Sequence, residues 1–199
     1  MIAGLAAYLF TAILTWTGLP ADCSTEQAAC DTWERIHFEK ADDARARFNM
    51  TATQIAKVAS GFATNLADGV SGEYSPDVAA YHALELTAIA FEESGFHKYV
   101  DDGTCNKDAT LNRKDPRGDC DSGKSFGDWQ IQPGWMVDRI IGRPTTGWEL
   151  VADRKLSVVA AWGIRDLRPS AWTVWPRARV RARDYARSHS IADAILPKE

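Results

Sequence analysis

The chain has 199 residues, of which 45% are hydrophobic and 25% charged, and its formal net charge is −4. A chain of this length can bury one hydrophobic core, and the composition is that of a globular protein rather than a disordered or fibrous one. The negative charge argues against a general nucleic-acid binder, because contacts with phosphates require a surplus of Lys and Arg.

The first segment, residues 2–19 (IAGLAAYLFTAILTWTGL), contains no charged side chain. Its length reaches the lower limit for a helix that crosses a bilayer. It lacks the basic leader and the small-x-small cleavage site of a secretory signal. We expect residues 1–22 to be an uncleaved membrane anchor or a removed signal-like segment, and a buried helix is the third interpretation. The first two interpretations send the rest of the chain across a membrane.

The cysteines are Cys23, Cys30, Cys105 and Cys120. An even number of cysteines behind an export-like segment predicts two disulfides. Of the three connectivities we favour Cys105–Cys120, at the ends of a polar loop, with Cys23–Cys30. The second pair requires Cys23 to lie in the turn before a helix, because two such residues inside one helix would be about 10 Å apart. Zinc is not expected, since no C-x-x-C motif occurs.

Two capping-box patterns predict two helices after the first segment. Ser24 with Gln27 predicts the start of a charged helix that runs to about Phe48. Thr51 with Gln54 predicts the start of the next one, in which apolar residues recur at helical spacing.

A third helix is predicted from Pro76 to about Ser94, because Ser75 and Pro76 are typical of an N-cap and a first helical position. An irregular stretch follows to Ser125. Further helices are predicted near residues 133–141, 148–168 and 177–188.

Alternating patterns typical of β-strands are almost absent, so the predicted fold class is mainly α. We expect three parts: the hydrophobic segment 1–22, a helical neck over residues 23–74, and a helical domain over residues 75–199.

Arginines are concentrated near the end of the chain. Residues 177–187 contain five arginines and one acid, Asp184. This pattern indicates either a solvated basic helix or a patch for an anionic polymer.

An apolar stripe in the third helix ends in an acid. Val78, His82, Leu86, Ile89 and Glu93 all point within roughly 40° of one direction. A carboxyl group at the end of such a stripe loses solvation, which favours its protonated form. Glu93 is therefore expected to face inward or into a cleft, as a general acid or as a helix-terminal residue paired with an arginine.

The preceding residue, Glu92, points about 100° away from Glu93. It shares its side of the helix with Tyr81, Glu85 and Ala88, which form a polar face. We expect Glu92 to be an ordinary surface acid.

Two short motifs carry a family resemblance. ESGF at 93–96, followed after the polar loop by GDWQIQP at 127–133, resembles the signature of soluble lytic transglycosylase and goose-type lysozyme domains. In those families a helix ends in Glu-Ser-x-Phe, and a later Gly-x-x-Gln-Ile-x-Pro stretch lines the same cleft. The resemblance implies a lysozyme-like helical domain that covers roughly residues 75–190.

The resemblance assigns a role to each matched residue. Glu93 would be the catalytic acid/base. Ser94 would hold the sugar that bears the peptide or steady the glutamate, and Gly127 would let the chain approach the sugar. Gln130 would hydrogen-bond an acetamido group of the substrate, and Trp129 would stack on a sugar ring or lie in the core.

The chain departs from the family pattern in two places. The family's Tyr-Asn-Ala-Gly stretch does not occur after the second motif, so Tyr185 is carried over as its nearest counterpart. The loop between the motifs is also long and rich in aspartate, which suggests calcium, but it lacks the spacing of an EF-hand. We expect no metal and no cofactor.

The implied activity is cleavage of the MurNAc–GlcNAc bond of peptidoglycan by a single glutamate, with closure of a 1,6-anhydro ring. If Asp128 faced the cleft as a second acid, a hydrolytic muramidase or endolysin would become plausible. The other readings are a phage virion (tail or ejection) component with a lysozyme-like domain, a membrane-released lysis enzyme, and a secretion-system wall-remodelling enzyme.

These readings also imply partners and a location. The partners would be peptidoglycan strands, a membrane through the N-terminal segment, and virion or secretion-system proteins. The chain would face the periplasm or cell wall, or belong to a phage particle.

Overall fold

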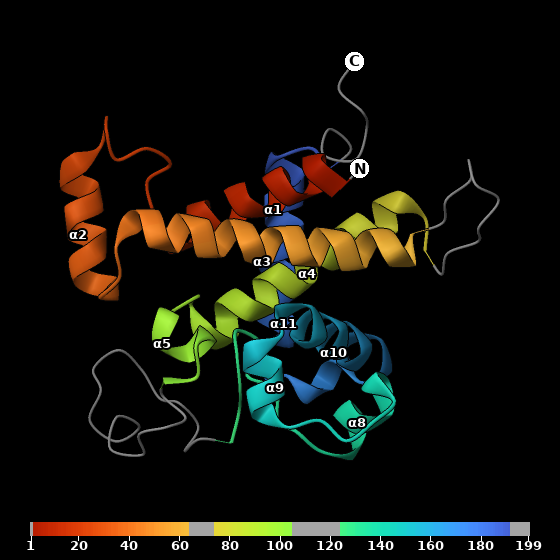
Figure 1. Ribbon diagram of the computed structural model, residues 1–199. Helices are drawn as coiled ribbons and strands as arrows, with labels where there is room; N and C mark the ends of the chain where they lie inside the picture. Colours follow the sequence, from red (N-terminus) through yellow and green to blue (C-terminus); the bar gives the residue numbers. More distant parts are fainter. Residues whose placement is uncertain (1, 64–73, 105–123, 192–199) are drawn as a thin grey trace.

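The computed structural model describes residues 2–63, 74–104 and 124–191 (Figure 1). Within these residues the chain is mainly helical, with two isolated β-bridges and no β-strand, so the predicted class is confirmed. The elements are α1 (Ile2–Thr17), α2 (Gln27–His37), α3 (Ala41–Phe62), α4 (Pro76–Ser94), α5 (Lys98–Asp101), α8 (Trp135–Ile141), α9 (Gly147–Ala152), α10 (Arg154–Leu167), the 3-10 turn η2 (Pro169–Ala171) and α11 (Trp175–Ser188).

The central element is α4, whose bounds agree with the predicted third helix. It begins at Pro76 after Ser75 in an extended conformation, and it ends at Gly95, which adopts the left-handed conformation (φ 58°) that favours glycine. Every residue from 83 to 90 is buried. A helix buried on all sides is typical of the middle of a fold, and α4 is in contact with α1, α3, α10 and α11.

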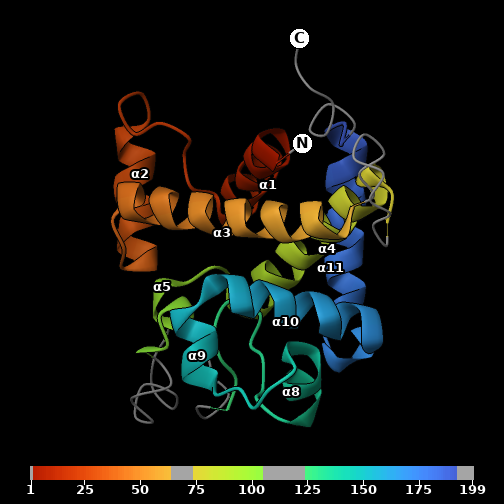
Figure 2. The same cartoon turned by 45° about the vertical axis from the view of Figure 1, so that its right-hand side comes forward.

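The N-terminal helix α1 lies along α3 (Figure 1, Figure 2). Leu5, Leu9 and Ile13 are at most 1% exposed and join the same core cluster as side chains of α3, α4, α10 and α11. Of the three roles considered for residues 2–19, the buried helix is the one that these contacts match. In the part of the chain that the structure describes, no helix combines the length and apolarity needed to cross a membrane.

The helix predicted from Ser24 to Phe48 is interrupted. Phe38 adopts a left-handed conformation (φ 55°) after α2, and α3 begins at Ala41. Ser24 caps no helix, because its hydroxyl and its amide both bond to Asp22. The start predicted at Thr51 is also wrong, since Thr51 lies buried in the middle of α3.

The predicted Cys23–Cys30 disulfide is confirmed, with Cys23 in the turn before α2 and the two Cα atoms 5.7 Å apart. Cys105 and Cys120 lie outside the described residues, so their predicted pairing stays a prediction.

The later helices follow the sequence prediction with one difference. The helix predicted over 148–168 is two helices, α9 and α10, which meet at Asp153. The side chain of Asp153 accepts a hydrogen bond from the amide of Leu156 and so caps the start of α10.

The basic helix α11 covers the polar face of α4. Arg181 and Arg177 lie 2.6 and 3.3 Å from the carboxylate of Glu92, and Arg179 lies 3.6 Å from that of Glu85. The side chains of Glu92 and Glu85 are only 12% and 4% exposed. Glu92 is therefore not a surface acid as expected, and three of the arginines pair with α4 rather than projecting into solvent alone.

Candidate functional site

Glu93 lies in the last turn of α4 and is half-buried. The next residue, Ser94, is buried; its hydroxyl donates to the carbonyl oxygen of Ala90 at 2.7 Å and accepts from the amide of Phe96 at 3.1 Å. The hydroxyl of Ser94 therefore stabilises the end of the helix that carries Glu93.

The second motif forms a tight loop over residues 126–131. Phe126 and Ile131 exchange two backbone hydrogen bonds of 3.0 Å, which close the loop. Gly127 (φ 67°) and Gln130 (φ 48°) both adopt the left-handed conformation, which explains the glycine at 127 and marks a strained turn at Gln130.

The side chain of Gln130 is half-buried, and its Nε2 donates to the carbonyl oxygen of Gly127 at 3.0 Å. Among the described residues no donor bonds to its Oε1. The amide is thus held by its nitrogen, and its oxygen can accept an N–H group from a ligand.

Trp129 is a core residue, the second of the two roles considered for it. It is 1% exposed, and its indole Nε1 donates to the carbonyl oxygen of Leu86 in α4 at 2.9 Å. Its own carbonyl oxygen accepts from the indole of Trp172 at 3.0 Å. These bonds fix the loop against α4, two helical turns (about 10 Å along the axis) before Glu93.

Asp128 also points into the protein. It is 1% exposed and accepts a 3.2 Å hydrogen bond from Arg154, which donates a second bond of 2.6 Å to Asp101. Burial and the neighbouring Asp101 raise the pKa of Asp128 to about 7, although Arg154 and Arg47 oppose the shift. Asp128 therefore does not face a cleft as a second acid, which hydrolysis would require.

A second arginine connects this cluster to the first motif. Arg47 of α3 makes two hydrogen bonds to Glu39, lies 3.6 Å from Asp101, and donates to the carbonyl oxygen of Phe96 at 2.7 Å. Phe96 ends the ESGF motif, so a continuous buried chain of charges joins the two motifs. No sequence pattern indicates these partners, because they come from separate elements with no shared spacing.

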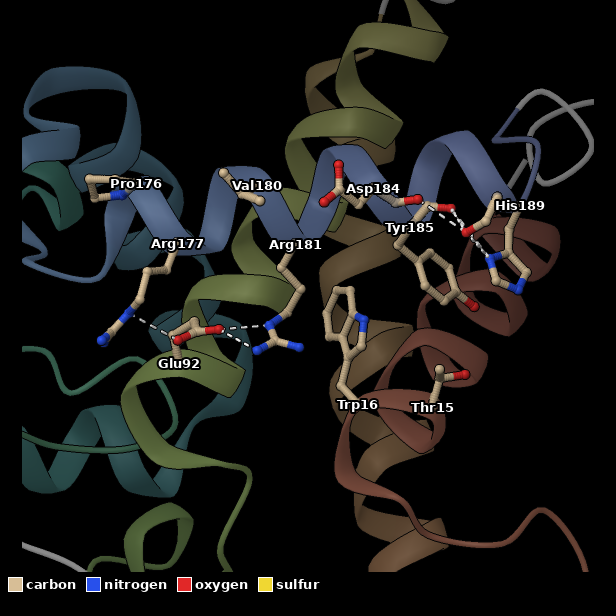
Figure 3. A pocket seen from close by; sticks show the side chains of 11 residues that line it. Thr15, Trp16, Glu92, Pro176, Arg177, Val180, Arg181, Asp184, Tyr185 and His189 are labelled. Atoms are coloured by element: carbon tan, nitrogen blue, oxygen red, sulfur yellow. Dashed lines mark hydrogen bonds and ion pairs between the residues drawn. The ribbon is translucent and has the colours of Figure 1, made fainter.

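Tyr185 lies elsewhere. It is buried on α11 against α1, with its ring 5.4 Å from those of Tyr8 and Trp16 and stacked on His189 at 4.2 Å. It lines a pocket together with Glu92 (Figure 3). Its described contacts do not bring it together with Glu93 or Gln130.

Within the described ranges, no group of three or more His, Cys, Asp or Glu side chains is placed to hold a metal ion. Most of the aspartates of the loop between the motifs lie outside those ranges.

Comparison of the chain with protein-family models, with curated proteins and with solved structures finds no match.

Proposed function

We propose that the chain is a lytic transglycosylase with a lysozyme-like helical domain, which cleaves the MurNAc–GlcNAc bond of peptidoglycan with Glu93 as its single acid/base. The observation that carries the proposal is the hydrogen bond from Trp129 to Leu86. It anchors the Gln130 loop on the same helix that ends in Glu93, which is the pairing that the two motifs imply.

The position of Glu93 suits a general acid. Such a group must hold its proton until it meets the leaving oxygen. Glu93 is half-buried in the last turn of α4, so its carboxyl group is partly shielded from water. The carboxyl group would protonate the glycosidic oxygen, and its carboxylate would then remove the proton of the C6 hydroxyl as the 1,6-anhydro ring closes.

The matched motifs offer no solvent-exposed second acid, which favours ring closure over hydrolysis. Asp128, the nearest candidate, is buried and bound by Arg154. The substrate's own acetamido group would then stabilise the oxocarbenium-like transition state. The free Oε1 of Gln130 would hold that acetamido group through its N–H.

The proposed substrate lies outside the inner membrane, and the Cys23–Cys30 disulfide fits an oxidising compartment. We therefore propose that the chain acts in the periplasm or cell wall, or as part of a phage particle that reaches the wall.

The test is digestion of purified sacculi by the full chain, with mass analysis of the products. We expect anhydromuropeptides from the wild type and a loss of at least about a hundredfold in Glu93→Gln, because a positioned general acid contributes about 10²–10⁴ in rate. The matched control is Glu26→Gln, the same change at an exposed position just before α2, which should keep the activity. Reducing-end muropeptides would replace the transglycosylase by a muramidase, and full activity in Glu93→Gln would refute the assignment.

A further inference from the structure

A pocket of about 790 Å³ lies between α1 and α11, beside the last turn of α4 (Figure 3). It is separate from the Gln130 loop, and none of its lining residues belongs to either motif. One of them, Glu92, is the neighbour of Glu93 in the chain. The two glutamates point about 100° apart, so a ligand in the pocket would lie alongside the end of the proposed catalytic helix.

The floor of the pocket is apolar and held in place. Trp16 of α1 packs against Phe91 and Tyr185, with ring centroids 6.0 and 5.4 Å away. Val180 of α11 also lines the pocket and is 47% exposed. Fixed aromatic and aliphatic side chains of this kind accept a small apolar group without losing much conformational freedom.

One end of the pocket carries surplus positive charge. Arg181 is fully engaged: it bonds Glu92 at 2.6 Å and its guanidinium lies over the ring of Phe91 at 4.3 Å. The printed contact of Arg177 with Glu92 is made by Nε, at 3.3 Å, and the side chain of Arg177 is 70% exposed. Two arginines thus face one carboxylate, and the more exposed of them, Arg177, has the longer contact with it. The guanidinium fork of Arg177 matches a carboxylate.

The other side of the pocket offers hydrogen-bond acceptors. The carboxylate of Asp184 is 57% exposed and accepts one hydrogen bond from Arg183 at 3.1 Å, and the hydroxyl of Thr15, which also lines the pocket, donates to the carbonyl oxygen of Thr11. The remaining lone pairs of these oxygens can accept the N–H groups of a peptide, an interaction that a hydrocarbon tail cannot make.

We propose that this pocket is a non-catalytic site for a short peptide, which binds Arg177 through a carboxylate and places a small apolar side chain against Trp16 and Val180. Combined with the proposed function, on which this identification rests, the peptide is the stem that hangs from the glycan strand of peptidoglycan. It carries free carboxylates, amide N–H groups and alanine methyl groups.

The test is calorimetric titration of the full chain with a free stem tetrapeptide (L-Ala-γ-D-Glu-diaminopimelyl-D-Ala). This probe contains no glycosidic bond, so its binding does not depend on cleavage. We expect saturable binding, with an NMR shift of the Trp16 indole. Arg177→Gln should weaken binding about tenfold, and Val180→Asp should abolish it by placing a charge against the apolar side chain of the ligand. Both positions are exposed enough for the variants to fold.

Arg187→Gln is the control, because it makes the same change on the same helix without lining the pocket. Absence of tetrapeptide binding at millimolar concentration would overturn the proposal, as would binding that neither variant alters. So would binding of decanoate alone, which would reveal a site for amphiphilic acids. Cleavage of sacculi without tetrapeptide binding refutes this inference only, whereas tetrapeptide binding without cleavage refutes only the transglycosylase assignment.

Discussion

Arg47 and Phe96 are 49 positions apart, yet the guanidinium of Arg47 donates a 2.7 Å hydrogen bond to the carbonyl oxygen of Phe96. The backbone that follows Glu93 is therefore held by α3, a helix from the N-terminal part of the chain. The same arginine lies 3.6 Å from Asp101, which is bound by Arg154. The end of α4 and the Gln130 loop consequently depend on one buried set of charges.

Asp101 is the member of this set that both arginines share. Asp101→Asn should lower the free energy of unfolding by about 3–5 kcal/mol, since it leaves two buried guanidinium groups short of a carboxylate. The next residue provides the control: Asp102 pairs with the exposed Lys98, and Asp102→Asn should cost less than about 1 kcal/mol. Urea unfolding of the two variants measures the difference, and equal losses would contradict the shared role of Asp101.

Asp128 should make stability depend on pH. Its pKa is raised from 3.8 to about 7 in the folded state, so between these values the folded chain keeps a proton that the unfolded chain has released. The stabilisation that protonated Asp128 gives to the folded state is therefore present at low pH and is lost as the pH rises through 7. Asp128→Asn replaces the protonated acid by a neutral amide of similar shape.

We expect Asp128→Asn and the wild type to have the same free energy of unfolding near pH 4. By pH 8 the variant should be the more stable chain by up to about 3–4 kcal/mol. The difference between the two chains is the quantity to measure, by denaturant unfolding across this range. His37 and His82 have the opposite effect on stability. Burial is the main cause that lowers their pKa values to about 4, so they favour the folded state as the pH rises from 4 to 6.5. Both chains contain these histidines, so their effect cancels when the two free energies of unfolding are subtracted. A constant difference from pH 4 to pH 8 would show that Asp128 does not titrate there.

The Cys23–Cys30 disulfide should stabilise the attachment of α2. Cys23→Ser with Cys30→Ser should lower the free energy of unfolding by about 2 kcal/mol, because the bridge closes a short loop (sequence separation 7) and limits the unfolded chain. The double variant, compared with wild type by calorimetry under oxidising conditions, leaves Cys105 and Cys120 unchanged. An unchanged melting temperature would contradict the prediction.

Substitution by alanine should change the stability of the protein in opposite directions at two glycines. A methyl group at Gly147 would overlap the ring of Phe126, which closes the Gln130 loop, whereas nothing lies within 4 Å of one at Gly61 in α3. Gly147→Ala should therefore cost about 1–3 kcal/mol, and Gly61→Ala should gain up to about 1 kcal/mol. Thermal unfolding checks both, and a neutral Gly147→Ala would mean that Phe126 moves freely.

Local signals in the sequence were sufficient for some elements and misleading for others. The bounds of α4 follow from Ser75, Pro76 and Gly95, which act on their immediate neighbours. The break between α2 and α3 falls at Phe38, whose left-handed conformation is one that large side chains rarely adopt. Thr51 resembles an N-cap in the sequence but lies inside α3. Its hydroxyl donates to the carbonyl oxygen of Arg47 and accepts a hydrogen bond from Arg154.

The environment of the acids on α4 could not be predicted from helical spacing. Glu92 and Glu85 read as solvent residues because their side of the helix is polar, but α11 supplies arginines to both from about 90 positions later. Helical spacing predicts that Glu92 and Glu93 point in different directions, but it does not predict which residues each of them contacts. The same reason hid the role of Asp128, whose partners come from α3, α5 and α10.

The pairing of α11 with α4 has a consequence for synthesis on the ribosome. When α4 has emerged, Glu92 still lacks Arg177 and Arg181, which are made about 90 residues later. The contact between α4 and α11 therefore stays incomplete until α11 leaves the exit tunnel. A messenger truncated before that helix would yield a product in which Glu92 lacks both of its arginines, whereas Glu85 would keep Arg165 of α10 at 2.9 Å.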